Sequence, residues 1–289
     1  MEYTVQSGDW VWGRNLRILL AAMAVLCLSL PAQAGETLNK IKKTGKVVVG
    51  TEAAFPPFEF VKGGKIVGYG KDILNHVVAG LDAKLEQRDV PWQGILPGLL
   101  AKKFDFVATS VILNPNRAKK FAFTMPIADG SLTLVKRKGD MRIKSVADLS
   151  GKSVATQLGT SAEKDLRAVN NDLKKKGKAG VKEMRLFTSI PEAYFALANR
   201  QVDAVLSPLP SVIVVIKKRP GVYEIVGPIG KQKSYFAWVT RKEDTELRDY
   251  INRKIKELHV SGMLTKLQEK WFGFRMELPT SGYLPEGAI

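Results

Sequence analysis

The sequence predicts an α/β fold with mostly parallel sheets. Short β-branched runs alternate with segments whose apolar residues recur at helical spacing, which is the pattern of strand–helix–strand units. The 289 residues are enough for one large domain or for two domains of about 100–150 residues. Hydrophobic residues make up 45% of the chain and charged residues 25%, as in an ordinary globular protein, so low-complexity disorder is not expected.

The individual elements can be predicted in order along the chain. Lys46–Gly50 is a β-branched run that ends in glycine, which predicts a buried strand, and residues 72–81 carry a helical apolar stripe. The other expected strands are Phe104–Thr109, Leu132–Val135, Lys152–Thr156 and Val202–Leu206. The other expected helices are residues 95–100, a helix from about Ser161, Ala193–Ala198, a helix through Leu247 and Leu258, and a last one from Met263 to Trp271. Two polar, glycine-bearing segments are candidate crossings between domains, Lys136–Asp140 and Gly227–Lys233.

The first 34 residues have the features of a secretory signal peptide. Arg14 and Arg17 precede an apolar run from Ile18 to Leu30, and Ala32-Gln33-Ala34 fits the small-residue rule for a cleavage site. The apolar run is about 13 residues long, which is short for a membrane span. We therefore expect removal of residues 1–34 and secretion to the periplasm, with an uncleaved anchor as the alternative.

Composition excludes several kinds of site. Cys27 is the only cysteine, so neither an intrachain disulfide nor a Cys-rich zinc site is possible. His76 and His259 are the only histidines, so we predict no metal ion and no cofactor. The sequence also lacks the motifs of serine hydrolases, P-loop nucleotide-binding proteins and zinc proteases.

The chain carries a net charge of +17, from 45 Lys and Arg against 28 Asp and Glu. The basic runs Lys174–Lys178 and Lys217–Arg219 are expected to be solvated helix ends and loops, because they lack interleaved aromatic residues. No nucleic acid is therefore predicted as a partner. A positive field favours anionic ligands and speeds their encounter. Attraction to an anionic membrane surface and a bias of the host proteome remain alternative explanations of the charge.

Two clusters of polar and aromatic residues follow predicted strands. The stretch from Gly50 to Phe58 places Glu52 and Phe55 at the carboxyl end of a strand, where α/β proteins bind ligands. Thr109 and Ser110 end another strand, and Arg117 follows seven residues beyond Ser110. Its guanidinium offers a planar fork for a carboxylate, and neighbouring hydroxyls can complete an anion cradle. The alternatives are a hydrophobic loop for the first cluster and a surface arginine for the second.

A third cluster lies between a strand and a helix. Thr160 and Glu163 have the spacing of a capping box, and Ser161 opens the helix. The free N–H groups of a helix N-terminus can also bind an anion. Ser189 and Glu192 repeat the spacing, and we predict only a structural role for them.

These clusters occur in an order that resembles the bacterial extracellular solute-binding proteins of family 3, the periplasmic receptors of ABC importers for polar amino acids. The likeness runs from about Leu38 to Phe272, nearly the whole chain after the predicted cleavage site. It is carried by Val49 to Phe58, Gly68-Tyr69 with Asp72, Trp92 to Pro97, Asp105 to Arg117, Phe121 to Thr124, Asp148 to Lys152, Gly159-Thr160-Ser161, Val202 to Val205 and Gly262 to Phe272.

The resemblance implies a two-lobed type II periplasmic-binding-protein fold, in which each lobe is an α/β sheet sandwich and the ligand is clamped between the lobes. The first lobe would comprise residues 35–134 and 235–289, and the second residues 135–234. The resemblance also implies a role for each of eight residues. Phe55 would stack on the ligand, Trp92 would cover it, Arg117 would hold its carboxylate with Thr109, Ser110, Thr160 and Ser161, and Glu52 would meet its side chain or amine.

The function implied by the resemblance is binding without catalysis. The protein would deliver an amino acid or a related carboxylate-bearing solute to the permease of an ABC uptake transporter, and it would be a monomer. One alternative is a periplasmic dehydratase of the cyclohexadienyl type on the same scaffold, which would need Glu52 or Glu163 as its acid. Another alternative is a receptor that signals to a membrane partner.

Three positions depart from the family pattern. Pro208 stands where the family usually has an aspartate for the ligand's ammonium group, Ile112 stands where it has a small or hydroxyl residue, and Gly70 replaces a common acid. Burying an ammonium without a partner costs several kcal/mol in rough terms. We therefore hypothesise a carboxylate-bearing ligand that is not a standard α-amino acid. If an ammonium does bind, Glu52 or backbone carbonyls must hold it.

Overall fold

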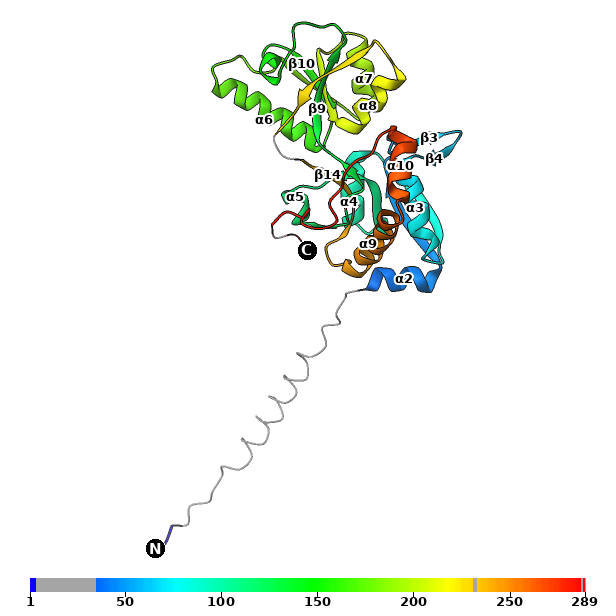
Figure 1. Cartoon of the computed structure of the whole chain (residues 1–289). Coiled ribbons are helices and arrows are strands. Elements are labelled where there is room, and N and C mark those ends of the chain that lie inside the picture. Colours follow the sequence, from blue (N-terminus) through cyan, green and yellow to red (C-terminus); the bar gives the residue numbers. More distant parts are fainter. Residues whose placement is uncertain (4–34, 231–232, 287, 289) are drawn as a thin grey trace. The chain divides into compact units, whose positions relative to one another are not determined.

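The computed structural model describes residues 1–3, 35–230, 233–286 and 288 (Figure 1). The chain divides into two compact units, Met1–Ala34 and Gly35–Ile289, and the division falls at the predicted cleavage position. Apart from residues 1–3, the predicted signal peptide with Cys27 lies outside the described residues. No helix in the described part of the chain is long and apolar enough to cross a membrane.

The first lobe is built on a sheet of six strands in the order β5-β1-β6-β14-β7, with β8 also paired to β14. These strands are β1 (Lys46–Thr51), β5 (Lys84–Asp89), β6 (Phe106–Ile112), β7 (Phe121–Phe123), β8 (Ala128–Asp129) and β14 (Tyr235–Arg241). A small sheet contains β2 (Ala54–Phe55), β3 (Glu59–Lys62) and β4 (Lys65–Val67). The helices are α2 (Glu36–Thr44), α3 (Tyr69–Ala79), α4 (Trp92–Leu100), α5 (Pro115–Ala118), α9 (Thr245–Val260) and α10 (Met263–Phe272).

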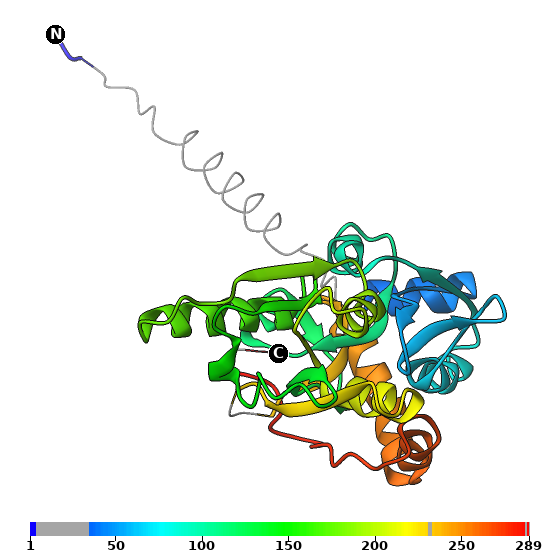
Figure 2. The same ribbon diagram turned by 90° about the horizontal axis from the view of Figure 1, so that it is seen from above.

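The second lobe is built on a sheet of five strands in the order β11-β10-β12-β9-β13. These strands are β9 (Leu132–Arg137), β10 (Ser153–Gln157), β11 (Glu183–Phe187), β12 (Ala204–Pro208) and β13 (Tyr223–Pro228). The helices are α6 (Ser161–Lys175), α7 (Ile190–Ala198) and α8 (Leu209–Lys218), with a short 3-10 turn at Val146–Leu149. The same lobe is seen from above in Figure 2.

Both sheets are mixed. β1 pairs in parallel with β5 and β6, and β10 pairs in parallel with β11 and β12. The antiparallel partners are β14 in the first sheet and β9 with β13 in the second. Every residue of β6 is buried, as expected for a strand covered on both faces of its sheet.

The chain crosses between the sheets earlier than the sequence predicts. β9 pairs with β12 from Leu132 onward, so the predicted boundary between residues 134 and 135 falls inside this strand. The segment Lys136–Asp140 lies at the far end of β9, and the prediction of a crossing there is wrong. An apolar strand continues through the predicted boundary, and the polar residues only mark its end. The two connections run side by side, with Gly130 N–H donating to Ser234 O at 2.8 Å.

A buried charge network holds the base of the first lobe. The Arg241 guanidinium donates to the carbonyl oxygens of Leu99 and Phe104 at 3.2 and 2.8 Å, and it lies 2.6 Å from the Asp244 carboxylate. The side chains of Arg241 and Asp244 are 5% and 4% exposed. Such a pair adds little net stability, but removing one partner leaves an uncompensated buried charge.

Asp244→Asn should therefore lower the free energy of unfolding by about 3 kcal/mol, measured by urea denaturation. Asp249→Asn is the matched control, because Asp249 pairs with Arg248 through a side chain that is 53% exposed. The control should change stability by less than about 0.5 kcal/mol. Equal stabilities for the two variants would contradict this account of the network.

Candidate functional site

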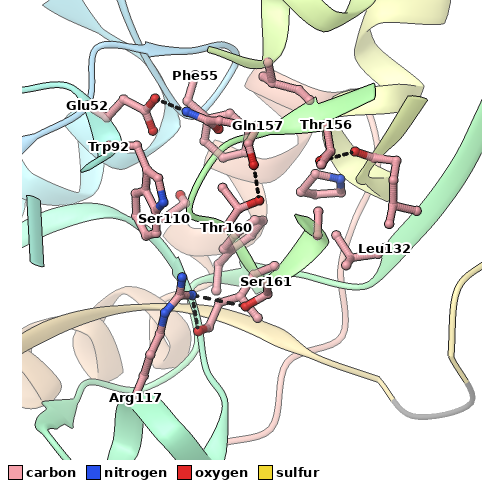
Figure 3. A pocket seen from close by; sticks show the side chains of 16 residues that line it. Glu52, Phe55, Trp92, Ser110, Arg117, Leu132, Thr156, Gln157, Thr160 and Ser161 are labelled. Carbon is pink, nitrogen blue, oxygen red and sulfur yellow. Dashed lines mark hydrogen bonds between the residues drawn. The ribbon is translucent and has the colours of Figure 1, made fainter. Parts of the chain in front are cut away.

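A pocket lies between the two lobes and takes side chains from both of them (Figure 3). Its empty volume is about 440 Å³, part of which opens to solvent. Seven of the eight predicted site residues line it: Glu52, Phe55, Trp92, Ser110, Arg117, Thr160 and Ser161. The departures from the family pattern at Ile112 and Pro208 line it as well. The eighth predicted residue, Thr109, is not among the lining residues.

Strand direction explains why these residues meet. Glu52 follows β1 and Ser110 lies in β6, and these two strands run in parallel. In the other lobe Gln157 ends β10, and Pro208 ends the parallel strand β12. The carboxyl ends of parallel strands lie at one edge of a sheet, and the pocket takes residues from that edge of each lobe.

Arg117 is a partly buried cation at the lobe boundary. Its Nη1 donates to Ile112 O at 3.0 Å and to the Ser161 hydroxyl of the other lobe at 3.3 Å. The guanidinium carbon lies 5.0 Å from the centre of the Trp92 ring, a cation–π contact. Burial lowers the pKa of Arg117 to about 10, so the group stays charged at neutral pH. Among the described residues, no carboxylate lies within 4.0 Å of it.

The segment before α5 orients Arg117. Asn114 caps α5, and its side-chain oxygen accepts a hydrogen bond from the Arg117 backbone N–H at 3.0 Å. The same Asn114 side chain donates to the Ser161 hydroxyl at 3.1 Å. Ser161 therefore accepts hydrogen bonds from two residues of the first lobe.

The predicted capping boxes form only in part. The Thr160 hydroxyl accepts from Glu163 N–H at 3.4 Å, but the Glu163 carboxylate accepts from Gly159 N–H at 2.7 Å instead of reaching Thr160. At the second box the Ser189 hydroxyl donates to Glu192 at 3.0 Å and does not cap the helix backbone. Both carboxylates accept hydrogen bonds outside the reciprocal pattern that the spacing alone suggests.

Glu52 lies against a residue of the second lobe. Its carboxylate accepts a hydrogen bond from the Gln157 amide, which also donates to Thr188 O at 3.1 Å. Burial raises the pKa of Glu52 to about 7, the Gln157 hydrogen bond opposes this rise, and the charge of Asp89 adds to it. Sequence reasoning missed Gln157, because its role depends on the approach of the lobes and no motif marks it.

A second acid lies behind the pocket wall. Glu59 is fully buried, and its carboxylate accepts from the Thr109 hydroxyl at 3.2 Å and from the Ser110 hydroxyl at 3.5 Å. Burial raises the pKa of Glu59 well above its usual range. A Cβ atom on Gly70 would lie 1.9 Å from a Glu59 oxygen, so the glycine leaves room for this carboxyl group. An acid thus occupies the space beside residue 70, but it comes from β3.

The remaining walls are apolar. The Phe55 ring stacks on Phe58 at 5.0 Å between ring centres and meets the edge of Phe236 at 5.8 Å. The second lobe contributes apolar side chains that sequence reasoning missed, because they belong to ordinary core patterns. They are Leu132, Ile190 and Leu206, next to Pro208. Glu52 is the only carboxylate among the lining residues.

Comparison with known proteins defines the class of this fold and site. The chain belongs to the bacterial extracellular solute-binding proteins, family 3, whose family model matches residues 47–274. It is 31% identical over 266 residues to the L-cystine-binding protein TcyJ of Escherichia coli (strain K12), covering 90% of this chain and 96% of that protein. It is 33% identical over 284 residues to a glutamate/aspartate import solute-binding protein of Salmonella typhimurium (strain LT2), covering 89% of each.

Solved structures agree with this class. An ancestral arginine-binding protein bound to arginine matches with a TM-score of 0.71 and 33% identity, over 79% of this chain and 99% of that one. An ancestral amino acid-binding protein described as a precursor of cyclohexadienyl dehydratase matches with a TM-score of 0.72 and 30% identity, over 82% and 99%. The predicted two-lobed α/β fold is confirmed.

The raised pKa of Glu52 predicts a pH-dependent effect of Glu52→Gln. The pKa is about 7 in the folded protein and 4.5 for an ordinary glutamate, so ionisation of Glu52 opposes folding as pH rises from about 4.5 to 7. At pH 8 the variant should be more stable than the wild type by about 2–3 kcal/mol. At pH 4.5 the two should be nearly equal. Urea denaturation across this range measures the difference, and a pH-independent difference would count against a protonated, buried Glu52.

Proposed function

We propose that this protein is the substrate-binding component of an ABC importer, which holds an amino acid or a related carboxylate-bearing solute between its lobes and delivers it to a membrane permease. One observation carries the proposal. Arg117 is a partly buried cation without an anionic partner among the described residues, and it faces Ser161 of the other lobe. A carboxylate between them would contact both lobes, so its binding energy would favour their approach.

The proposal includes binding without catalysis. A dehydratase would need an acid placed against the substrate. Glu163 accepts from Gly159 N–H and pairs with Arg167 at 2.7 Å, which accounts for its carboxylate. Glu52 is then the one candidate acid at the pocket, and it accepts a hydrogen bond from Gln157. The absence of turnover of a cyclohexadienyl carboxylate by the purified protein would support binding alone.

Within this class of solutes, we propose that the pocket favours a carboxylate without a free α-ammonium group beside it. Ile112 and Pro208 line the pocket where relatives of this family usually contact that ammonium, and neither side chain offers a hydrogen-bond acceptor. Glu52 is able to accept hydrogen bonds from another part of the solute. The names of relatives, which bind cystine, glutamate or aspartate, support the carboxylate. Those solutes also carry an α-ammonium group, so the proposed lack of one rests on Ile112 and Pro208 alone.

Further parts of the proposal concern the chain outside the pocket. We place the lobe boundaries at the start of β9 and at the start of β14, so that residues 132–234 form the second lobe. Residues 1–34 would be a cleavable signal peptide and the protein would act as a periplasmic monomer. The family description as extracellular supports secretion.

Thermal melting against a panel of solutes tests the proposed function. The purified protein, stripped of bound solute, is melted with α-amino acids, their deaminated analogues, dicarboxylates, cystine and amino-acid conjugates. A solute at about 100 times its Kd adds about 2.7 kcal/mol, which raises Tm by several degrees at this size. Shifts confined to carboxylates without a free α-amino group would support the proposed solute class. The absence of any shift with carboxylates would contradict the proposal.

Arg117→Met should weaken binding of the solute with the largest shift by at least about 100-fold, or about 2.7 kcal/mol, because the carboxylate loses its charged partner. Isothermal titration calorimetry measures the loss. Arg253→Met is the control, since Arg253 is an exposed residue of α9. A loss of less than about tenfold in Arg117→Met would remove Arg117 from the site.

Pro208→Asp should bring binding of ordinary α-amino acids, because it places a carboxylate at the pocket wall for their ammonium group. Asp is favourable at the N-cap of α8, the position that Pro208 occupies, so we expect the variant to fold. The same melting panel measures the gain, and Pro208→Ser serves as a control without the charge. If only the deaminated solutes still shift the melting of Pro208→Asp, position 208 does not contact the ammonium.

A further inference from the structure

The lobes touch at a second place outside the pocket, where α8 of the second lobe meets α10 of the first. The two helices are in contact, and Figure 1 shows α10 below α8. Lys217 lies in the last turn of α8, and its ammonium group donates to Phe272 O at 3.2 Å. Phe272 is the last residue of α10. A cation of one lobe therefore lies at the C-terminus of a helix of the other.

The chemistry of this contact suits an ammonium group. The last carbonyl oxygens of a helix have no partner within the helix and carry the negative end of its dipole. Gly273 follows in the left-handed region with φ of 75°, and a Cβ atom there would lie 3.0 Å from the Lys217 nitrogen. The glycine thus both ends α10 and leaves room for the lysine.

Two aromatic rings of the first lobe extend the contact. The Lys217 nitrogen lies 5.7 Å from the centre of the Phe274 ring, and the Lys218 nitrogen lies 5.8 Å from that of Phe60 on β3. Both distances are within the range of cation–π attraction. The Phe60 ring in turn meets the edge of Trp271 at 6.0 Å. The basic run that the sequence assigns to a solvated helix end is thus also a contact between lobes.

We infer that Lys217 and Lys218 form a latch that stabilises the closed arrangement of the lobes whether or not a solute is bound. Both cations belong to the second lobe and all their partners to the first, so separation of the lobes breaks these contacts. None of the two lysines and their three partners, Phe60, Phe272 and Phe274, lines the pocket. The latch therefore acts on the equilibrium between open and closed forms without touching the solute. The latch would also raise the affinity for a solute, because that affinity scales with the fraction of closed protein. Only this consequence rests on the proposed function.

Distance measurement between spin labels tests the latch in protein made from the full chain and free of solute. The labels are attached at Lys120→Cys in the first lobe and Ala168→Cys in the second, in a Cys27→Ser background; both positions are exposed. The variants are Lys217→Met, which keeps the alkyl stem and removes the charge, and Lys217→Arg, which keeps the charge. Lys175→Met is the control, because it removes the same charge from the last turn of another helix of the second lobe.

The latch predicts that the ratio of closed to open forms falls about three- to tenfold in Lys217→Met, the effect of one hydrogen bond. It predicts wild-type ratios in Lys217→Arg and Lys175→Met. Equal ratios in Lys217→Met and Lys175→Met would overturn the inference, and so would a wild type without any closed form. Circular dichroism confirms that each variant is folded. Because no solute is present, a negative result in this experiment would not contradict the proposed function. A melting panel without any shift would likewise not contradict the latch.

Discussion

The pocket between the two lobes is organised around the guanidinium of Arg117, a partly buried charge at their boundary. Removing a cation from water costs several kcal/mol unless an opposite charge replaces the lost hydration. Ile112 O, the Ser161 hydroxyl and the Trp92 ring compensate for part of this loss. In the proposed function, the solute's carboxylate supplies the missing charge at a point that both lobes reach. The same contact would then both bind the carboxylate and favour closure of the lobes. The other pocket residues would determine which carboxylate binds.

Both lobes contribute side chains that determine which carboxylate binds. The first lobe contributes Glu52, Ser110 and Arg117 together with aromatic rings, and Glu59 lies behind Ser110. The second lobe contributes the polar residues Thr156, Gln157, Thr160 and Ser161 and an apolar part around Leu206 and Pro208. Both walls therefore combine polar and apolar groups. Pro208 adds to the apolar part of the second lobe, at a position where an aspartate would offer a charge.

The sequence predicts those parts of the site that depend on local residue patterns. The runs before Glu52 and Ser110 identify strands, and parallel strands bring their carboxyl ends together, so seven of the eight predicted residues meet in the pocket. Contacts that depend on how the lobes approach have no local pattern. The sequence therefore does not mark Gln157 as a site residue, and it predicts only a solvated helix end for Lys217. The crossing into the second lobe is misplaced, because Leu132 begins an apolar strand that gives no sign of a boundary.

The position of β14 has a consequence for how the chain reaches its final form. This strand comes from residues 235–241, yet it lies between β6 and β7 inside the first sheet. A chain that emerges from its N-terminus cannot complete that sheet until about four-fifths of its length is available. Until then β6 has an unpaired edge, and the first lobe is held in an unfinished state. In the proposed secretion of this chain, the late arrival of a central strand would delay completion of the first lobe through topology alone.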